Sequence, residues 1–326
     1  MNMLQLDRAP NIDASNEGDP LLFLLRYLAE TEYRFVTVTP ASHQRVLARH
    51  RGTPGMTRTD VLGWSRPYVP GSIDPTVERL LGDAGAIEAA GDGLRRSTVR
   101  VSTVHQRLFL HSAFPTVAED SVFLGPDSYR FADLIIGELA AFPLDPGDVV
   151  VDMGTGSGVG AVTCAGVVPD TRLFMTDINP RALRFARINA EASGCAITAL
   201  QGRNLAGMEE GIAVAIANPP YVIDPGHRAY RDGGRNHGGE ISLEMARAAA
   251  TALKPGGRFI LYTGSAIVGG TDLLREKLSE IAQSHSCALR YRELDPDVFG
   301  EELELPHYRD VDRIAVVAAT MTRAPR

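Results

Sequence analysis

The sequence predicts an α/β protein with a doubly wound, Rossmann-like sheet of seven strands and a smaller α+β domain before it. Three observations carry this prediction. From about residue 116 onward, apolar strand-like runs alternate with helical segments, as in parallel sheets covered by helices. The apolar run 149–151 leads into a glycine-rich turn at 154–158. A second apolar run, 212–217, ends in the polar segment 218–221.

The N-terminal part, over residues 20–115, mixes helical patterns with a hairpin pattern. Leucines recur at helical spacing near its start, and a Thr-Pro pair is typical of an N-cap and the first helical turn. The expected elements are helices over 20–31 and 76–82, a helix beginning at Thr39-Pro40, and hairpin strands over 97–104 and 107–111. Helices followed by a hairpin outline a winged-helix-like module.

Three arginines, Arg95, Arg96 and Arg100, would decorate that hairpin and raise the question of nucleic-acid binding. The chain as a whole has a formal net charge of −7. Affinity for nucleic acid comes largely from Lys and Arg against phosphate. We therefore expect the hairpin to pack on the following domain rather than to contact nucleic acid.

The C-terminal part, over residues 116–326, shows the strand–helix rhythm of a parallel sheet with helices on both faces. Strands are expected at 148–153, 172–176, 196–201, 212–217, 257–263, 288–292 and 313–320. Helices are expected at 159–167, 180–192, 239–253 and 271–284.

Composition sets bounds on the environment of the chain. Residues 1–19 are mostly polar and predict a disordered leader without the features of a signal peptide. No apolar stretch reaches the length of a membrane span. The cysteines Cys164, Cys195 and Cys287 are far apart and match no metal-ligand spacing, so we expect buried thiols, no metal and a cytoplasmic protein.

The glycine turn predicts a nucleotide-like ligand at the carboxyl ends of the strands. Gly154, Gly156 and Gly158 permit a tight turn and a close approach of backbone to ligand. The same stretch fits the loose dinucleotide fingerprint. Asp152 argues against a dinucleotide, because a carboxylate before the turn would repel a pyrophosphate but suit a ligand ammonium group.

The segment Asn218-Pro219-Pro220-Tyr221 predicts a clamp for a flat, nitrogen-bearing group. An amide or aromatic amine nitrogen is a poor nucleophile because its lone pair is delocalised. The Asn218 side-chain oxygen and the Pro219 carbonyl can each accept one of its N–H bonds, and Tyr221 can stack on the planar group. Catalysis would then rest on positioning and electrostatics, without a metal or a covalent intermediate.

Together, in this order, the two motifs resemble class I S-adenosylmethionine (SAM) methyltransferases that act on amide or exocyclic amine nitrogens. The similarity is to the release-factor glutamine N-methyltransferases and the adenine-N6 DNA methyltransferases. It covers roughly residues 120–320 and implies that 116–326 form a SAM-binding catalytic domain, with 20–115 as an accessory, substrate-recognition domain.

The resemblance implies further contacts with SAM. Asp177 ends the second strand, where a carboxylate can accept both ribose hydroxyls, and Ile178 would pack on the adenine. Asn204 takes the place of an aspartate that relatives use for the adenine amino group; its amide oxygen can accept the same bond without charge assistance. Asn218 is expected to serve both cofactor and acceptor.

Several other segments have less specific patterns. The stretch 224–234 resembles the family's substrate loop, where Arg228, Tyr230, Arg231 and Asp232 could bind an acceptor or tie the loop down. Gly125-Pro126-Asp127-Ser128-Tyr129 matches in part a proline signature near the methionine end of SAM. Surface roles are expected for His227 and His237, a packing role for Trp64, and an approach to the acceptor side for the acidic loop 295–302.

Three classes of function stay open from the sequence. The leading hypothesis is an N-methyltransferase whose acceptor is a small amine or amide or a protein glutamine, favoured over nucleic acid. The second is a SAM-consuming cyclase of the azetidine-2-carboxylate synthase type, which would release methylthioadenosine. The third is a non-catalytic SAM-sensing protein, which has no need for the Asn218 clamp.

Overall fold

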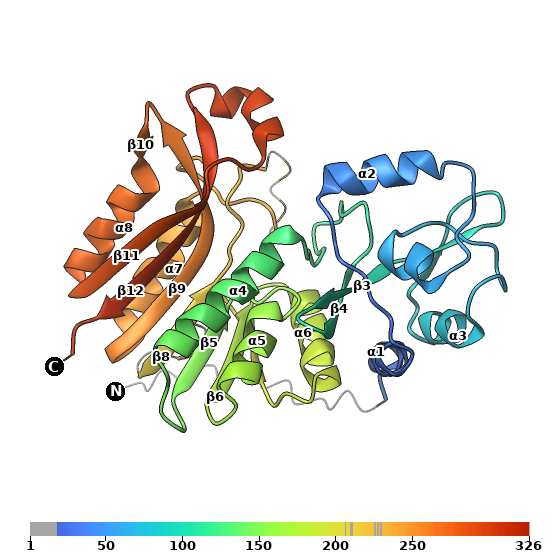
Figure 1. Ribbon diagram of the computed structural model, residues 1–326, viewed down its shortest axis with the longest axis horizontal. Helices are drawn as coiled ribbons and strands as arrows, with labels where there is room; N and C mark the ends of the chain where they lie inside the picture. The colour runs from blue at the N-terminus through green and yellow to red at the C-terminus, as the bar shows by residue number, and fades with distance from the viewer. Residues whose placement is uncertain are drawn as a thin grey trace, which may run out of the picture.

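The computed structural model describes residues 18–205, 207–208, 211–224, 226, 228 and 230–325. A twisted sheet forms its centre, with seven strands in the order β11-β12-β9-β8-β5-β6-β7 and the short β10 beside β9 (Figure 1). The strands are β5 Val149–Met153, β6 Arg172–Asp177, β7 Thr198–Gln201, β8 Ile212–Ala217, β9 Leu253–Val268, β10 Thr271–Asp272, β11 Cys287–Asp295 and β12 Arg313–Arg323.

The sheet is mixed, whereas the sequence predicted a parallel one. Strands β5 to β9 pair in parallel along the sheet, but β12 is antiparallel to both β9 and β11. A parallel neighbour of β11 would need a crossover, usually an α-helix. The connection from β11 to β12 instead contains the short 3-10 helices η2 Gly300–Glu304 and η3 Pro306–Tyr308, so β12 returns beside β11.

Five helices cover the sheet in two layers. One face carries α4 Pro126–Ala141, α5 Val159–Val167 and α6 Pro180–Ala192; the other carries α7 Glu240–Ala252 and α8 Leu273–Ser284 (Figure 1). Apolar side chains of α7 and α8 form one core with the sheet, and those of α4 form a second core on the opposite face. Helix α4 is absent from the sequence prediction, although its first turn lines the site described below.

The N-terminal elements pack beside α6. They are α1 Pro20–Glu30, α2 Pro40–Arg49, the π-helical turn η1 Thr59–Gly63, α3 Pro75–Asp83, β1 Ile87–Ala89, β2 Arg95–Ser97, β3 Val99–Val104 and β4 Arg107–Ser112. The predicted start of α2 is confirmed, because the Thr39 side chain accepts the Ser42 N–H. Strands β3 and β4 form the predicted hairpin.

The three arginines expected on the hairpin do not form an exposed basic face. Arg95 and Arg96 lie on β2, which pairs with β1, and form ion pairs with Glu78 and Glu88. Arg100 lies on the hairpin, but its side chain is buried and Nε donates to the Gly63 carbonyl at 2.9 Å. The hairpin therefore packs inward, as the acidic composition favoured.

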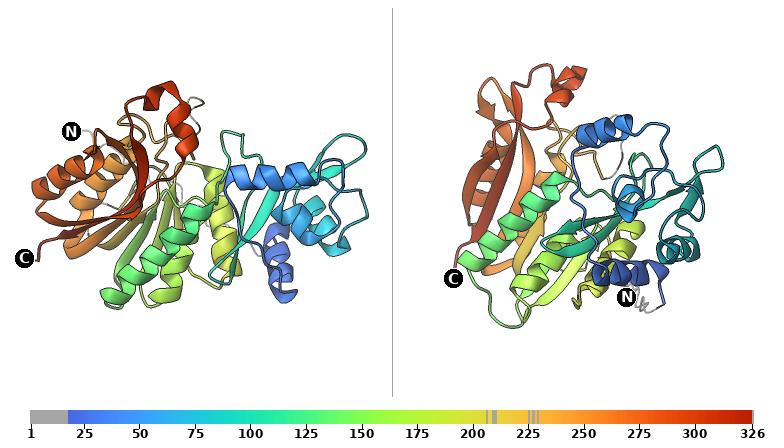
Figure 2. Two further views of the ribbon diagram at one scale, coloured as in Figure 1. Left: turned by 45° about the horizontal axis from the view of Figure 1, so that its top comes forward. Right: turned by 45° about the vertical axis from the view of Figure 1, so that its right-hand side comes forward.

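Residues 1–17 of the expected leader lie outside the described residues, and its last residue is part of the fold. Asp19 caps α1 through a hydrogen bond from the Leu21 N–H at 2.9 Å and forms an ion pair with Arg184 of α6 at 2.9 Å. Leucines of α1 share one core with Phe185 and Ile188 of α6. Figure 2 shows the N-terminal elements beside this helix.

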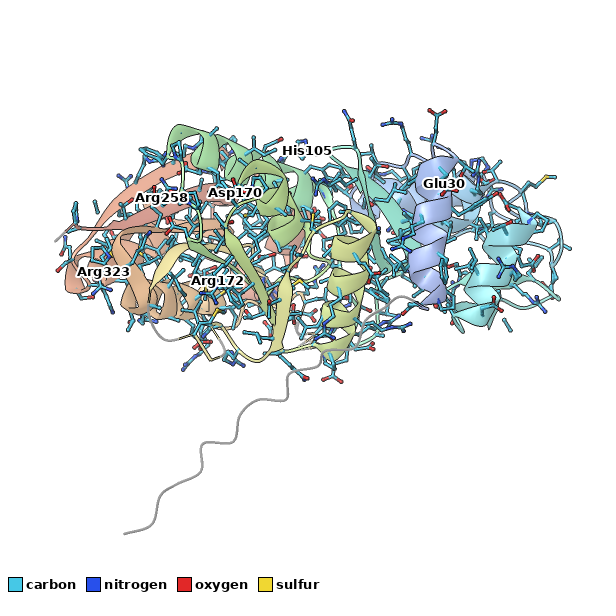
Figure 3. The ribbon with its side chains drawn as sticks, turned by 90° about the horizontal axis from the view of Figure 1, so that it is seen from below. Glu30, His105, Asp170, Arg172, Arg258 and Arg323 are labelled. Carbon is cyan, nitrogen blue, oxygen red and sulfur yellow. The ribbon has the colours of Figure 1, made fainter. Side chains whose placement is uncertain are left out.

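The two ends of the parallel strands lie on opposite sides of the molecule. Figure 3, seen from below, labels Arg172, Arg258 and Arg323, which lie on the side where the parallel strands begin. The carboxyl ends of the parallel strands lie on the opposite side, where the cavity described below is found.

Within the described part of the chain, no helix combines the length and apolar character needed to cross a bilayer.

Candidate active site

The strand order places a ligand crevice between β5 and β8. The chain moves from β5 toward β6 and β7, and from β8 toward β9, so the connections leave these neighbouring strands in opposite directions. Ligands of open α/β sheets bind at such a switch point, outside the carboxyl ends of the strands. A cavity of about 390 Å³ lies here, lined by the ends of four strands and by the start of α4.

The glycine turn after β5 forms the floor of this cavity. Gly154 and Gly156 line it, with φ angles of +66° and +56° that side chains rarely adopt. Gly158 lies outside the lining: it begins α5, and a Cβ there would come within 3.1 Å of the Ala186 Cβ on α6. We therefore assign Gly158 to helix packing rather than to direct ligand contact.

Asp152 lies beneath the turn and lines the cavity. Its Oδ2 accepts hydrogen bonds from the Thr155 hydroxyl at 2.6 Å and from the Ala161 N–H at 2.9 Å. A Cβ on Gly160 would lie 2.7 Å from this oxygen, so the carboxylate fits only against glycine. Burial raises the pKa of Asp152 to about 6, and the charge of Asp177 adds to that shift.

Asp177 at the end of β6 connects the glycine turn to the cavity wall. Its Oδ2 accepts the Gly156 N–H at 2.9 Å and its Oδ1 accepts the Asn179 N–H at 2.9 Å. Burial raises the pKa of Asp177, and these two backbone amides oppose the shift. The adjacent Ile178 lines the cavity with 48% of its surface exposed, which makes it an apolar platform.

Asn204 follows β7 and lines the same cavity. Its φ angle of +52° is left-handed, a conformation that asparagine tolerates better than most residues. The Thr176 hydroxyl donates to the Asn204 carbonyl and fixes this turn. The structure thus brings six of the seven predicted cofactor residues that precede β8 into one cavity, with Gly158 as the exception.

Asn218, Pro219 and Tyr221 follow the end of β8, the neighbour of β5, and line the same cavity as the glycine turn. The Asn218 side chain is half-buried and makes no hydrogen bond with any residue that the structure describes, so its amide oxygen is available to a ligand. The backbone behind the segment is tightly covered. A Cβ on Gly238 would lie 2.4 Å from the Tyr221 carbonyl oxygen, so only glycine fits at position 238.

Asp127 is a site residue whose role the sequence prediction missed. It lies in the first turn of α4, lines the cavity, and accepts the Tyr221 hydroxyl at 2.7 Å and the Tyr262 hydroxyl at 3.1 Å. Burial raises the pKa of Asp127, and the two phenols oppose that shift. Burial also raises the pKa of Tyr221 well above its ordinary value, so its hydroxyl remains a donor. An acid directly after a helix-starting proline was the available signal.

The loop after Tyr221 is tied down through its charged residues. Arg228 grips Asp224 through two bonds, Nε–Oδ2 at 2.7 Å and Nη2–Oδ1 at 2.5 Å, and this contact holds the pKa of Asp224 at about 2. Arg231 pairs with Glu302, and the Tyr230 hydroxyl donates to the Thr116 carbonyl at 2.6 Å. These contacts tie the loop down, but Tyr230, Arg231 and Asp232 also line the cavity, so a role in acceptor binding stays a prediction.

The acidic loop 295–302 reaches the site through an aromatic side chain. Phe299 lines the cavity, and its ring meets the Tyr221 ring edge-on at 5.7 Å between centroids. His237 contacts Asp310 at 3.3 Å, away from the cavity lining, while His227 lies outside the described residues. Trp64 packs against Phe35 with ring centroids 5.0 Å apart, as a packing anchor would.

Comparisons with known proteins agree with this geometry. A family model described as "Methyltransferase small domain" matches residues 133–287. Human methyltransferase HEMK2 is 33% identical over 149 residues, which cover 42% of this chain and 68% of HEMK2. The chain belongs to the class I SAM-dependent methyltransferases. Its fold and its cofactor, SAM, follow from this membership.

Other relatives of this methyltransferase carry more specific names. The release factor glutamine methyltransferase of Deinococcus radiodurans is 36% identical over 123 residues, covering 34% of this chain and 44% of the relative. The chain thus spans less than half of that curated relative. Among solved structures, TYW2 of M. jannaschii in complex with AdoMet gives a TM-score of 0.47 at 15% identity, covering 69% of this chain and 87% of that one.

Proposed function

We propose that this methyltransferase transfers the methyl group of SAM to the side-chain amide nitrogen of a glutamine in a protein partner. The carrying observation is that Asn218 and Pro219, after β8, line the same cavity as the glycine turn after the neighbouring strand β5. In the transfer, the bond between methyl carbon and sulfur breaks and a carbon–nitrogen bond forms. The nitrogen loses one proton, and S-adenosylhomocysteine leaves.

The residues at the floor of the cavity suit SAM. When bound, SAM supplies an electrophilic methyl group on a positively charged sulfur. Among the described residues, four carboxylates line the cavity, and those of Asp127, Asp152 and Asp177 complement the positive charges of the ligand. Asp177 suits the ribose hydroxyls, Ile178 the adenine face, and the backbone at Gly154 and Gly156 leaves room for a close approach.

The clamp residues activate the acceptor by orientation. We assign the Asn218 amide oxygen and the Pro219 carbonyl as acceptors for the two N–H bonds of the glutamine amide. This turns the nitrogen lone pair toward the methyl group, and the two prolines hold the carbonyls in place. Tyr221 covers the planar group, and Asp127 fixes the orientation of Tyr221 through its hydroxyl.

A neutral amide suits the charges of this cavity better than a phosphate-bearing acceptor does. Arg228 and Arg231 of the adjacent loop are paired with Asp224 and Glu302. Arg203, which also lines the cavity, is paired with Glu244, so little positive charge is left for phosphate. Relatives named as release factor glutamine methyltransferases support a protein glutamine as acceptor.

The N-terminal region, over residues 20–115, is proposed as the substrate-recognition domain. Pro40, at the start of α2, lines the cavity and places this region beside the acceptor. The three cysteines are unpaired, which suits a reducing compartment, and we propose that the enzyme acts in the cytoplasm.

The test combines an acceptor screen with a clamp variant. The purified protein is incubated with SAM and with candidate glutamine-bearing proteins, and S-adenosylhomocysteine release is followed. We expect release only with an acceptor, one added methyl group on a glutamine in the mass spectrum, and loss of both in Asn218→Ala with SAM binding kept. Methylthioadenosine formed from SAM alone, or undiminished transfer by Asn218→Ala, would overturn the proposal.

A further inference from the structure

Asn189 on α6 is a fully buried side chain that the transfer mechanism does not use. Its Nδ2 donates to the Ser157 carbonyl at 2.8 Å and to the Leu110 carbonyl at 3.0 Å, and its Oδ1 accepts the Leu110 N–H at 2.8 Å. A side-chain amide can make four hydrogen bonds, so three of its four positions are filled by backbone.

The partners of Asn189 belong to two distant parts of the chain. Leu110 lies in β4, in the two-stranded sheet β3–β4 of the N-terminal region. The amide pairs with its N–H and C=O as a neighbouring strand would. Ser157 lies in the glycine turn, between Gly156 and Gly158, and lines the cavity. One side chain therefore joins the N-terminal hairpin to the cofactor turn.

Helix α6 carries this connection because it is shared by both parts of the fold. Phe185 and Ile188 belong to the N-terminal core, whereas Ala186 meets the glycine turn at Gly158. Figure 1 shows α6 between the central sheet and the N-terminal strands. Asn189 thus lies on a helix that packs against both the N-terminal core and the glycine turn.

We propose that Asn189 is a positioning residue that makes SAM affinity depend on the docking of the N-terminal region. The amides on either side of Ser157 are held within the cofactor domain, since Gly156 N–H donates to Asp177 and Gly158 N–H donates to the Thr155 carbonyl at 2.9 Å. The Ser157 carbonyl is held by Asn189. Without the Asn189 amide the buried Ser157 carbonyl loses its partner, and the turn relaxes toward conformations that satisfy it. This inference rests on the SAM assignment and not on the identity of the acceptor.

The test measures SAM binding by calorimetry in three variants. Asn189→Asp keeps an acceptor for Leu110 but loses both donated bonds, and Asn189→Leu loses all three. Leu278→Ala in α8 is the control, because it weakens the core on the other face of the sheet, whose described residues include none from α6 or from the N-terminal elements. We expect the Kd for SAM to rise roughly tenfold in the Asn189 variants, the factor that corresponds to about 1.4 kcal/mol, and to stay unchanged in Leu278→Ala.

Two outcomes would overturn the inference while leaving the proposed function intact. One is a wild-type Kd in both Asn189 variants. The other is an equal rise in Leu278→Ala at matched melting temperature, which would indicate general destabilisation. A wild-type protein that does not bind SAM would instead contradict the proposed function itself.

Hydrogen exchange on the wild-type protein gives a second test if the variants do not fold. Amides that belong to one cooperative unit share one free energy of opening, and this free energy falls in the same way for all of them as denaturant is added. We expect the amides of the glycine turn, 154–158, and of β4 to lose protection together. Independent opening of the turn and the hairpin would contradict the coupling.

Discussion

Replacing Tyr221 by Phe removes one hydroxyl from the site and leaves the ring in place. Tyr221 donates to the Asp127 Oδ2 at 2.7 Å and lies 7% exposed, directly after Pro220. A hydrogen bond to a charged group contributes about 1.5 to 3 kcal/mol. Because this bond fixes a ring that covers the acceptor, we expect kcat to fall about tenfold to a hundredfold, with the Kd for SAM unchanged.

Tyr262→Phe is the matched control for this variant. Tyr262 donates to the other oxygen of the same carboxylate, at 3.1 Å, and is fully buried. Tyr221 lines the cavity, whereas Tyr262 is not among the described residues that line it. Each variant removes one hydroxyl that donates to Asp127, so both should lower the melting temperature. Only Tyr221→Phe should slow methyl transfer.

The assay is S-adenosylhomocysteine release at saturating SAM, with melting temperatures and calorimetric SAM binding measured on the same preparations. The double variant Asp127→Asn with Tyr221→Phe should be little slower than Asp127→Asn alone, because the two groups act as one unit. The reasoning is refuted if Tyr262→Phe slows transfer as much as Tyr221→Phe at equal stability, or if Tyr221→Phe keeps the wild-type rate.

Three further predictions concern the cofactor side and the backbone. Asp177→Asn should weaken SAM binding about tenfold, measured by calorimetry, and equal affinity would exclude the proposed ribose contact. Since burial raises the pKa of Asp152 to about 6, above about 4 for the unfolded chain, ionisation opposes folding. The SAM-free protein should therefore lose stability as pH rises from about 4 to 6, and Asp152→Asn should lose less over that window in thermal melts. Gly264→Ala should lower the melting temperature and the transfer rate, because its Cβ would lie 2.2 Å from the Tyr221 ring; a variant as stable and active as wild type would contradict this packing.

Local sequence signals defined most of the sheet and its helices. Helices α5 and α6 and strand β8 have the predicted bounds, because glycine, Pro180 and Asn218 mark their ends. The antiparallel direction of β12 could not be predicted in this way, since it depends on pairing with β9 and not on its own residues. The resemblance to class I methyltransferases concerns the fold as a whole, whereas the residues of β12 alone carry no signal for its direction.

The parts of the site that the sequence did not reveal depend on distant contacts. Asp127 acquires its role from hydroxyls that lie 94 and 135 residues away along the chain. Asn189 acquires its role from backbone groups 79 and 32 residues away. Pro126-Asp127 indicates the start of a helix but not these partners, and Asn189 has no motif signal at all. In contrast, Asp177 ends β6 and Asn218 follows β8, so both could be predicted from their positions.

The central claim is that the Asn218 clamp presents an amide nitrogen to SAM for methyl transfer. The most direct measurement incubates the enzyme with methyl-labelled SAM and a glutamine-bearing protein acceptor, and locates the label by mass spectrometry, with Asn218→Ala beside it. The account predicts one labelled methyl on a glutamine side-chain nitrogen, absent in Asn218→Ala although SAM still binds. Label on another atom, or methylthioadenosine without any labelled acceptor, would contradict it.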